Sequence, residues 1–227
     1  MLLFGNLTPQ MAVATILAVL IGMTVHEFAH NYVGYLMGDP TPKLQGRLTL
    51  DPRVHINPVG FLMFVLIGFG ILGQAPINPQ RMRDPRWGFL AAVAAGPLSN
   101  LLLAIVFAIP IRLMSIAPFT LYKIIFEGNT SSPTDFLVML LGQLVFWNVL
   151  LFIFNLLPVF PIDGWHIVLA LLPPSLAYEW QRHRQTTNYI LLGLILLSFI
   201  QIPGLDILGM VIFRPVYSIV LSLLGIF

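Results

Sequence analysis

Two histidines and a glutamate stand close together in the stretch HEFAH, in which His26 and His30 are four residues apart and Glu27 lies between them. On a helix, residues with this spacing lie on one face, one turn above the other. The pattern is typical of two imidazoles that bind zinc beside a glutamate that acts as a general base. The alternative is a pair of buried histidines that are hydrogen-bonded to neighbouring helices.

A catalytic zinc ion takes three protein ligands and keeps one coordination position open. The chain has no cysteine, so the third ligand must be an aspartate, glutamate or histidine elsewhere. Asp163 is the best candidate, because it follows Pro158 and Pro161, which interrupt regular helix, and precedes Gly164. An ordinary turn uses the same residue types, so only the pairing with the two histidines favours a metal ligand here.

The other histidines are weaker candidates. His166 stays an alternative third ligand, although a helix-surface or core histidine is the interpretation that we favour. His55 and His183 lie in predicted loops and are expected to be solvated.

The composition indicates where this chemistry takes place. The chain of 227 residues is 58% hydrophobic and only 9% charged, whereas soluble domains carry about 25% charged residues. No basic run suggests a nucleic-acid partner. The sequence therefore predicts an all-α polytopic membrane protein, and ionisable side chains inside a membrane span are a functional hypothesis by default.

Apolar runs long enough to cross a bilayer, about 20 residues, define the expected spans. They give about five to six membrane helices, with the tail counted among them. Pro203 and Gly204, in the segment 201–206, interrupt this tail. The candidate spans are 11–37, 57–73, 87–113, 135–157 and the tail 187–225.

The segment 57–73 is either a span or a re-entrant segment, since it is short and rich in glycine. If it re-enters, the basic residues of loops 38–56, 74–86 and 174–186 share one side of the membrane, and loop 114–134 on the other side has only Lys123. The same topology brings Asp163 to the side on which the two histidines lie. We therefore expect a re-entrant segment, with the N-terminus outside.

The stretch 43–51 alternates loosely, with Leu44, Leu48 and Leu50 on one face. It predicts a short strand beside the site, which could accept an unwound substrate by strand addition. A plain loop, or a strand paired only within the protein, is an equal alternative. Leu48 is the residue that we expect to contact the substrate.

The segment 91–100 pairs small residues at a spacing of four, which lets helices approach closely. We expect it to pack against the helix that carries the histidines, where Asn100 could hydrogen-bond to the site.

Four stretches in order resemble the site-2 protease family of intramembrane zinc metalloproteases, across roughly residues 15–175. These stretches are HEFAH (26–30), GRLTLDPRVHINPVG (46–60), AAGPLSN (94–100) and NLLPVFPIDG (155–164).

The resemblance implies roles for individual residues. It makes His26, His30 and Asp163 the ligands of one Zn²⁺ ion and Glu27 the catalytic glutamate that activates water. Asn155 matches an asparagine that contacts substrate or stabilises an oxyanion, and Asn100 matches the family's asparagine after Gly-Pro. The active site is then expected inside the membrane, nearer the cytosolic face.

The chain departs from the family pattern at two positions. Asn57 stands where many relatives have an aspartate, and Trp165 stands where a smaller residue is common. Neither change removes an expected ligand, but Trp165 is expected to narrow the cavity.

The combined interpretation is a zinc-dependent intramembrane endopeptidase in one membrane-embedded domain over residues 1–227, with a core at about 11–175. Its expected partners are the lipid bilayer and transmembrane substrate proteins or remnant signal peptides, in the cell membrane and with no nucleic acid. A metal-binding transporter and a non-catalytic relative are the alternatives, and both leave Glu27 without a role. The substrate and the oligomeric state stay open.

Overall fold

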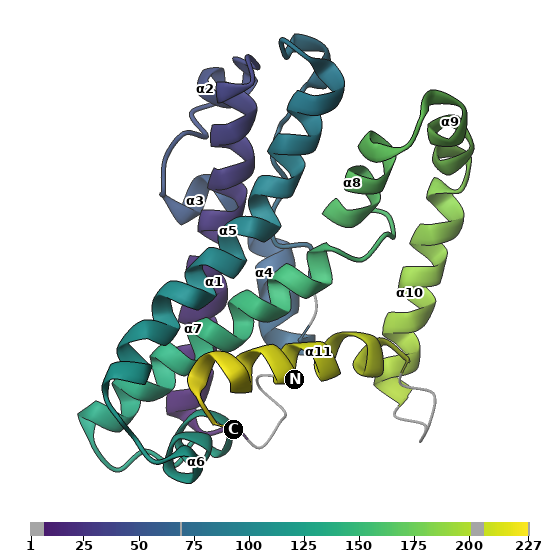
Figure 1. Ribbon diagram of the computed structural model, residues 1–227. Coiled ribbons are helices and arrows are strands. Elements are labelled where there is room, and N and C mark those ends of the chain that lie inside the picture. The colour runs from purple at the N-terminus through teal and green to yellow at the C-terminus, as the bar shows by residue number, and fades with distance from the viewer. Residues whose placement is uncertain (1–6, 69, 201–206, 227) are drawn as a thin grey trace.

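The computed structural model describes residues 7–68, 70–200 and 207–226 (Figure 1). It is all-helical, with 77% of the residues in helices. Three helices are long and apolar enough to cross a membrane, and their bounds lie within two residues of the predicted spans. They are α1 (Pro9–Leu36), α5 (Pro85–Leu113) and α7 (Pro133–Asn155). The larger expected number of spans is not confirmed in the described part of the chain.

Each of the three long helices begins with the same two signals. A polar residue at the N-cap accepts a hydrogen bond from a backbone N–H of the first turn, and a proline follows it at the first helical position. The capping residues are Thr8, Asp84 and Ser132. These signals explain why the helix starts are sharply defined.

The three long helices pack against one another, and α1 and α7 run in the same direction with α5 antiparallel to them (Figure 1). Small residues allow this close approach. Ala14 and Ala18 on α1 and Ala92 on α5 are buried, and a Cβ at Gly96 on α5 would overlap the side chain of His30 on α1. This packing supports the sequence-based expectation for the small residues of segment 91–100.

An apolar core fills the end of the bundle away from the histidines. Its buried residues come from α1, α5, α7, α6 (Pro118–Glu127) and α11 (Ile207–Leu224). Arg112, at the end of α5, donates to the carbonyls of Ser222 and Leu223 and so caps the last turn of α11. The predicted break at 201–206 lies outside the described residues.

The segment 57–73 folds back on itself. Its helix α4 (Pro58–Ile67) has 10 residues, about 15 Å at the rise of an α-helix, which is half the thickness of a bilayer core. The chain then returns so closely that a Cβ at Gly60 would lie 1.8 Å from the Ile71 carbonyl oxygen. Ile56 and Gly73 form an antiparallel bridge, so the two ends of the segment meet. This geometry agrees with a re-entrant segment and not with a crossing.

The strand predicted at 43–51 is not formed. Residues Thr41–Leu44 make the helical turn α2, and Gly46 follows with a positive φ of 66°. The prolines at 40 and 42 favour this turn, because they fix φ and remove backbone donors. Leu44 and Leu50 are 75% and 58% exposed, so the alternation of leucines does not mark a buried face.

Three described helices lie between α7 and α11 in the chain, namely α8 (Asp163–Leu171), α9 (Pro174–Arg182) and α10 (Arg184–Ile200). Figure 1 shows α9 at the same end of the molecule as α2, with α6 at the opposite end. Leu191 and Ile195 of α10 pack on Ile162 and on residues at the end of α7. Two short elements between α1 and α5 complete the described fold, α3 (Pro52–His55) and η1 (Pro79–Arg81).

Candidate metal centre

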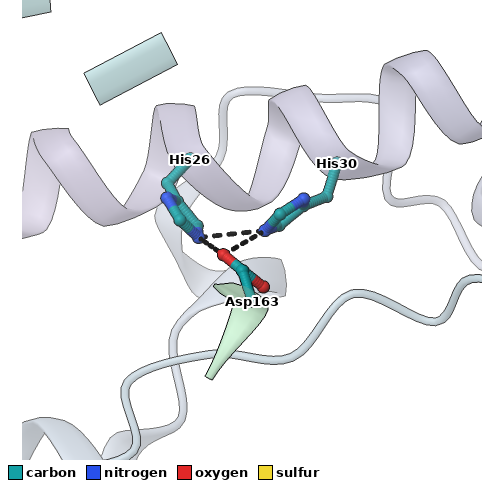
Figure 2. A group of neighbouring side chains, drawn as sticks. All are labelled: His26, His30 and Asp163. Carbon is teal, nitrogen blue, oxygen red and sulfur yellow. Dashed lines mark hydrogen bonds and ion pairs between the residues drawn. The ribbon is translucent and has the colours of Figure 1, made fainter. Parts of the chain in front are cut away.

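The structure brings His26, His30 and Asp163 together, although 133 positions separate the last two (Figure 2). The Oδ2 atom of Asp163 lies 3.1 Å from Nε2 of His26 and 3.2 Å from Nε2 of His30. The two Nε2 atoms are 2.9 Å apart. Both imidazoles are buried, and the carboxylate is 20% exposed. Three atoms that can bind a metal therefore converge on one point.

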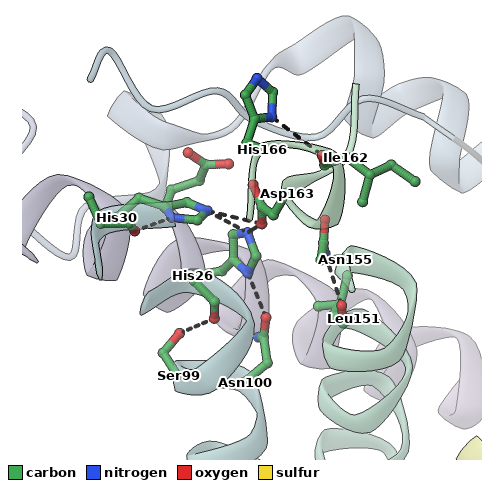
Figure 3. A network of polar contacts seen from close by, with 12 residues as sticks. His26, His30, Ser99, Asn100, Leu151, Asn155, Ile162, Asp163 and His166 are labelled. Atoms are coloured by element: carbon green, nitrogen blue, oxygen red, sulfur yellow. Dashed lines mark hydrogen bonds and ion pairs between the residues drawn. The ribbon is translucent and has the colours of Figure 1, made fainter. Parts of the chain in front are cut away.

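The hydrogen bonds of His26 leave its Nε2 atom free to act as a ligand (Figure 3). Its Nδ1 lies 2.7 Å from Oδ1 of Asn100. The Asn100 amide nitrogen donates to the Gly22 carbonyl and to Oδ1 of Asn148, which fixes the orientation of the amide. Oδ1 of Asn100 is thus an acceptor, and His26 carries its proton on Nδ1.

A backbone carbonyl of α5 orients the imidazole of His30. Its Nδ1 lies 2.8 Å from the carbonyl oxygen of Ala92 on α5, and a carbonyl only accepts, so Nδ1 carries the proton here too. Pro97, one turn later on α5, has no N–H and leaves the carbonyl of Val93, the residue after Ala92, without its helical donor. A Cβ at Gly96 would lie 2.3 Å from Nε2 of His30. Glycine is therefore required for α5 to approach the imidazoles.

The donor set fits a divalent metal such as zinc. Both Nδ1 protons are used in hydrogen bonds, so each neutral imidazole presents a lone pair on Nε2. Oδ2 of Asp163 presents a third lone pair. Such acceptors repel one another at about 3 Å unless a cation or protons lie between them. Ligands at about 2.0–2.1 Å in tetrahedral arrangement lie roughly 3.3 Å apart, close to the distances observed. Two imidazoles and one carboxylate are also a known ligand set of catalytic zinc.

Asp163 reaches the histidines because α8 is fixed at both ends. At its start, a Cβ at Gly164 would lie 2.4 Å from two backbone carbonyl oxygens at the end of α7, so only glycine permits this contact. At its end, the Arg86 guanidinium of α5 donates to three carbonyls. They belong to Ala170 (2.7 Å), Leu171 (2.9 Å) and Leu172 (3.1 Å).

Glu27 lies beside the ligands in a confined place. It is 4% exposed, and its Oε2 has no hydrogen-bond partner among the described residues. A Cβ at Gly73 would lie 2.6 Å from Oε1 of Glu27. The segment 70–75, which returns from the end of α4 and with it forms what we call the α4 hairpin, therefore passes directly over the carboxylate. A buried, unpaired carboxylate is costly, which suits a group that handles a proton.

A cavity of ≈ 750 Å³ joins these residues. The ligands, Glu27, residues 70–75 and part of α10 line it. Asn155 lines the cavity, and its amide nitrogen donates to the Leu151 carbonyl at 2.9 Å. Neither Leu48 nor Trp165 is among the described lining residues. Trp165 packs against Phe160 and Trp180 instead, so it does not narrow the cavity as expected.

The remaining histidines differ from expectation in one case. His166 lines the cavity but its ring packs against Phe89 and Phe160, outside the group of three ligand atoms. His183 is exposed, as expected. His55 is only 2% exposed, so the prediction that it is solvated is wrong.

The burial of His55 follows from local structure. Asp51 caps α3, and the side-chain hydrogen bond from Arg53 lowers the pKa of this carboxyl to about 2. The short helix packs on α1, and Nε2 of His55 lies 2.6 Å from the Thr49 carbonyl oxygen. A loop without long apolar runs gave no signal of this burial.

Sequence reasoning also missed Asn148, which is fully buried and holds Asn100 at 2.8 Å. A polar side chain in the middle of an apolar span was the available signal, since it lies seven residues before Asn155 and thus on the same face of α7. The role of Gly73 had no signal, because it depends on the return of the hairpin.

Comparison with known proteins agrees with this chemistry. The chain is 37% identical over 160 residues to "Putative zinc metalloprotease YwhC" of Bacillus subtilis (strain 168), a match that covers 70% of this chain and 69% of the relative. It is 28% identical over 187 residues to "Putative zinc metalloprotease Rip2" of Mycobacterium tuberculosis (strain ATCC 25618 / H37Rv), which covers 80% of this chain and 64% of the relative. No family model and no solved structure matches the chain.

Proposed function

Because the chain belongs to the site-2 protease family of zinc metalloproteases, we propose that it is an intramembrane zinc endopeptidase. It hydrolyses peptide bonds within or next to transmembrane segments, in regulated proteolysis or in the clearance of remnant signal peptides. The observation that carries this proposal is the convergence of three acceptor atoms beside the buried, unpaired carboxylate of Glu27. A site that only stores metal has no need of that carboxylate.

His26, His30 and Asp163 would hold the metal, with Asn100 and the Ala92 carbonyl orienting the imidazoles. A zinc ion bound there would polarise a carbonyl and lower the pKa of a water toward neutrality. Glu27 then accepts the proton of the attacking water and passes it to the leaving amine. Asn155, at the cavity wall, donates a hydrogen bond to the developing oxyanion.

The substrate must be unwound before cleavage, because the hydrogen bonds of a helix occupy its peptide groups. The segment 43–51 offers no strand for this purpose. Residues 70–75 are the better candidate, since they line the cavity without helical structure and pass over Glu27. We propose that the unwound substrate pairs with this part of the chain.

In this proposal, α1, α5 and α7 cross the bilayer, and the metal centre lies toward its cytosolic face. Basic residues support this orientation, because they are concentrated at the site end, in the loops around α2 and η1 and at α9. The opposite end has Arg112, Lys123 and, on α11, Arg214. Since the chain has no native cysteine, single cysteines at Gln45 and Arg83 should react with an impermeant reagent from the same side of sealed vesicles.

Glu27→Gln tests the proposed function. The variant should retain about one zinc per chain, measured by elemental analysis, and lose cleavage of a model membrane substrate by at least about 10³-fold. Asp163→Ala should lose both zinc and cleavage. Glu179→Gln, at an exposed glutamate, is the matched control and should keep both.

Two outcomes would contradict the proposal. Retained cleavage by Glu27→Gln would exclude Glu27 as the base. Metal flux across vesicles that contain the wild-type protein, without cleavage, would favour a transporter.

A further inference from the structure

One basic side chain lines the same cavity as the metal centre. Arg184, the first residue of α10, is the single lysine or arginine among the described residues that line it. Asn188, one turn later on the same helix, also lines the cavity. A substrate segment that lies between the α4 hairpin and α10 therefore passes this guanidinium.

Arg184 is positioned but not neutralised. Its guanidinium lies 4.1 Å from the ring centroid of Phe160, which also lines the cavity, and this cation–π contact fixes where the charge stands. No carboxylate of the described chain forms an ion pair with it. The neighbouring Arg182 differs, because it is paired with Glu179 at 3.3 Å and does not line the cavity.

The charges around the cavity indicate what Arg184 binds. Glu27 and Asp163 are the acidic residues that line it. A divalent metal on the ligands would balance these two carboxylates, which leaves the guanidinium as the uncompensated charge. Its planar donors match the geometry of a carboxylate.

We propose that Arg184 is a specificity-determining residue that binds an acidic side chain of the substrate, within a few residues of the scissile bond. This inference rests on the proposed function, since it concerns the substrate of the same site. The expected ligand of Arg184 is a carboxylate of the substrate peptide, because the guanidinium lines the cavity that also contains the metal ligands and Glu27.

A set of matched substrates tests the proposal. One model transmembrane peptide is prepared with a single Asp, or with Asn, at each position within four residues of the cut. For the wild-type protein, Asp should raise kcat/KM over Asn by about fivefold at one or two positions, as expected for a solvent-exposed ion pair. Arg184→Gln should abolish this ratio, and Arg182→Gln should keep it.

A charge exchange sharpens the test. Arg184→Glu should prefer Lys over Asp at the same position, which a merely structural role of Arg184 would not produce. If the wild-type protein cleaves Asp and Asn peptides equally at every position, the inference is wrong although the proposed function stands. If the Arg184→Gln effect follows the content of anionic lipid and not the peptide charge, Arg184 binds headgroups and the inference is also wrong.

Binding is measured separately from cleavage, so that the two proposals fail in different ways. The Glu27→Gln protein should bind the Asp peptide about fivefold more tightly than the Asn peptide, and the Glu27→Gln/Arg184→Gln protein should bind both equally. If no peptide is cleaved by the wild-type protein, the proposed function fails, and this binding ratio still decides on Arg184.

Discussion

Two buried polar networks connect α1 and α7 at different depths, and they end differently. At the site, the amide nitrogen of Asn100 donates to Oδ1 of Asn148. Oδ1 of Asn100 accepts from Nδ1 of His26 (Figure 3). Farther from the site, Gln143 accepts from Thr15 and Trp147, and its amide nitrogen donates to a backbone carbonyl of α6. We call these the asparagine network and the glutamine network.

The two networks resemble each other in burial but not in consequence. Asn100 and Asn148 are 0% exposed and Gln143 is 3% exposed, so each amide must be satisfied inside the protein. The asparagine network ends on the imidazole of a predicted metal ligand, whereas the glutamine network ends on main chain and holds helices together. A polar residue inside an apolar helix is thus functional only if its chain of contacts leads to reacting atoms.

Gly96→Ala should have the largest effect, because it acts on the ligands themselves. The new Cβ would lie 2.3 Å from Nε2 of His30 and 2.8 Å from Cε1 of His26, so α5 must move away or the imidazoles must turn. Zinc occupancy, measured by elemental analysis after dialysis against a weak chelator, should fall at least about tenfold.

Gly142→Ala is the matched control at the other network. Its Cβ would lie 2.4 Å from Cδ1 and Cγ1 of the buried Ile125. Because this side chain does not touch the ligands, the variant should lose thermal stability but keep zinc. Equal zinc loss in both variants would mean that any disturbance of helix packing empties the site.

Asn100→Ala should have the next largest effect. The variant leaves His26 without the acceptor that fixes its tautomer, and losses of outer contacts to metal-bound histidines cost about 10–100-fold in metal affinity. Competition with a fluorescent chelator measures this affinity. Asn148→Ala acts one contact farther out and should weaken binding less than Asn100→Ala does; the reverse order would contradict the proposed direction of the network.

Much of the framework could be predicted from the sequence. The long helices follow from the length of the apolar runs and from the polar N-caps followed by proline. The number of expected membrane crossings between the histidines and Asp163 predicts that all three lie on the same side. The convergence of His26, His30 and Asp163 needed only this parity and the helical spacing of four. Both are properties of chain order, which the sequence contains directly.

Contacts between segments that are distant in the sequence could not be predicted from local patterns, and the two networks are examples. Asn148 and Gln143 are amide residues five positions apart on one apolar helix. The spacing of Asn148 from Asn155 indicates a shared face, but the packing of α7 against α1 and α5 decides which amide meets the site. The leucine alternation at 43–51 failed for a related reason, since a short pattern near prolines and glycine has no buried face to enforce it. The burial of His55 depends on the docking of α3, a contact between segments that are distant from any strong local signal.

Gln143→Leu should lower stability without affecting the metal. It leaves the Thr15 hydroxyl, the Trp147 indole N–H and the Ile125 carbonyl without their partner. Hydrogen bonds between membrane helices contribute about 0.6 kcal/mol each on average, and unsatisfied partners add to the cost, so we expect a loss of about 1–3 kcal/mol in the free energy of unfolding. Unfolding in detergent micelles measures this loss, and a fall in zinc affinity would show that the two networks are coupled.

Thr15→Val should have the smallest effect and separates hydrogen bonding from packing in the glutamine network. Valine keeps the shape of the buried threonine and removes only a donor, which reaches Gln143 Oε1 at the long distance of 3.3 Å. Trp147 still donates to the same oxygen at 3.0 Å, so no acceptor is left unsatisfied. The free energy of unfolding should fall by no more than about 0.6 kcal/mol, and zinc affinity should not change. A larger loss would mean that the threonine hydroxyl carries the network and that Trp147 is secondary.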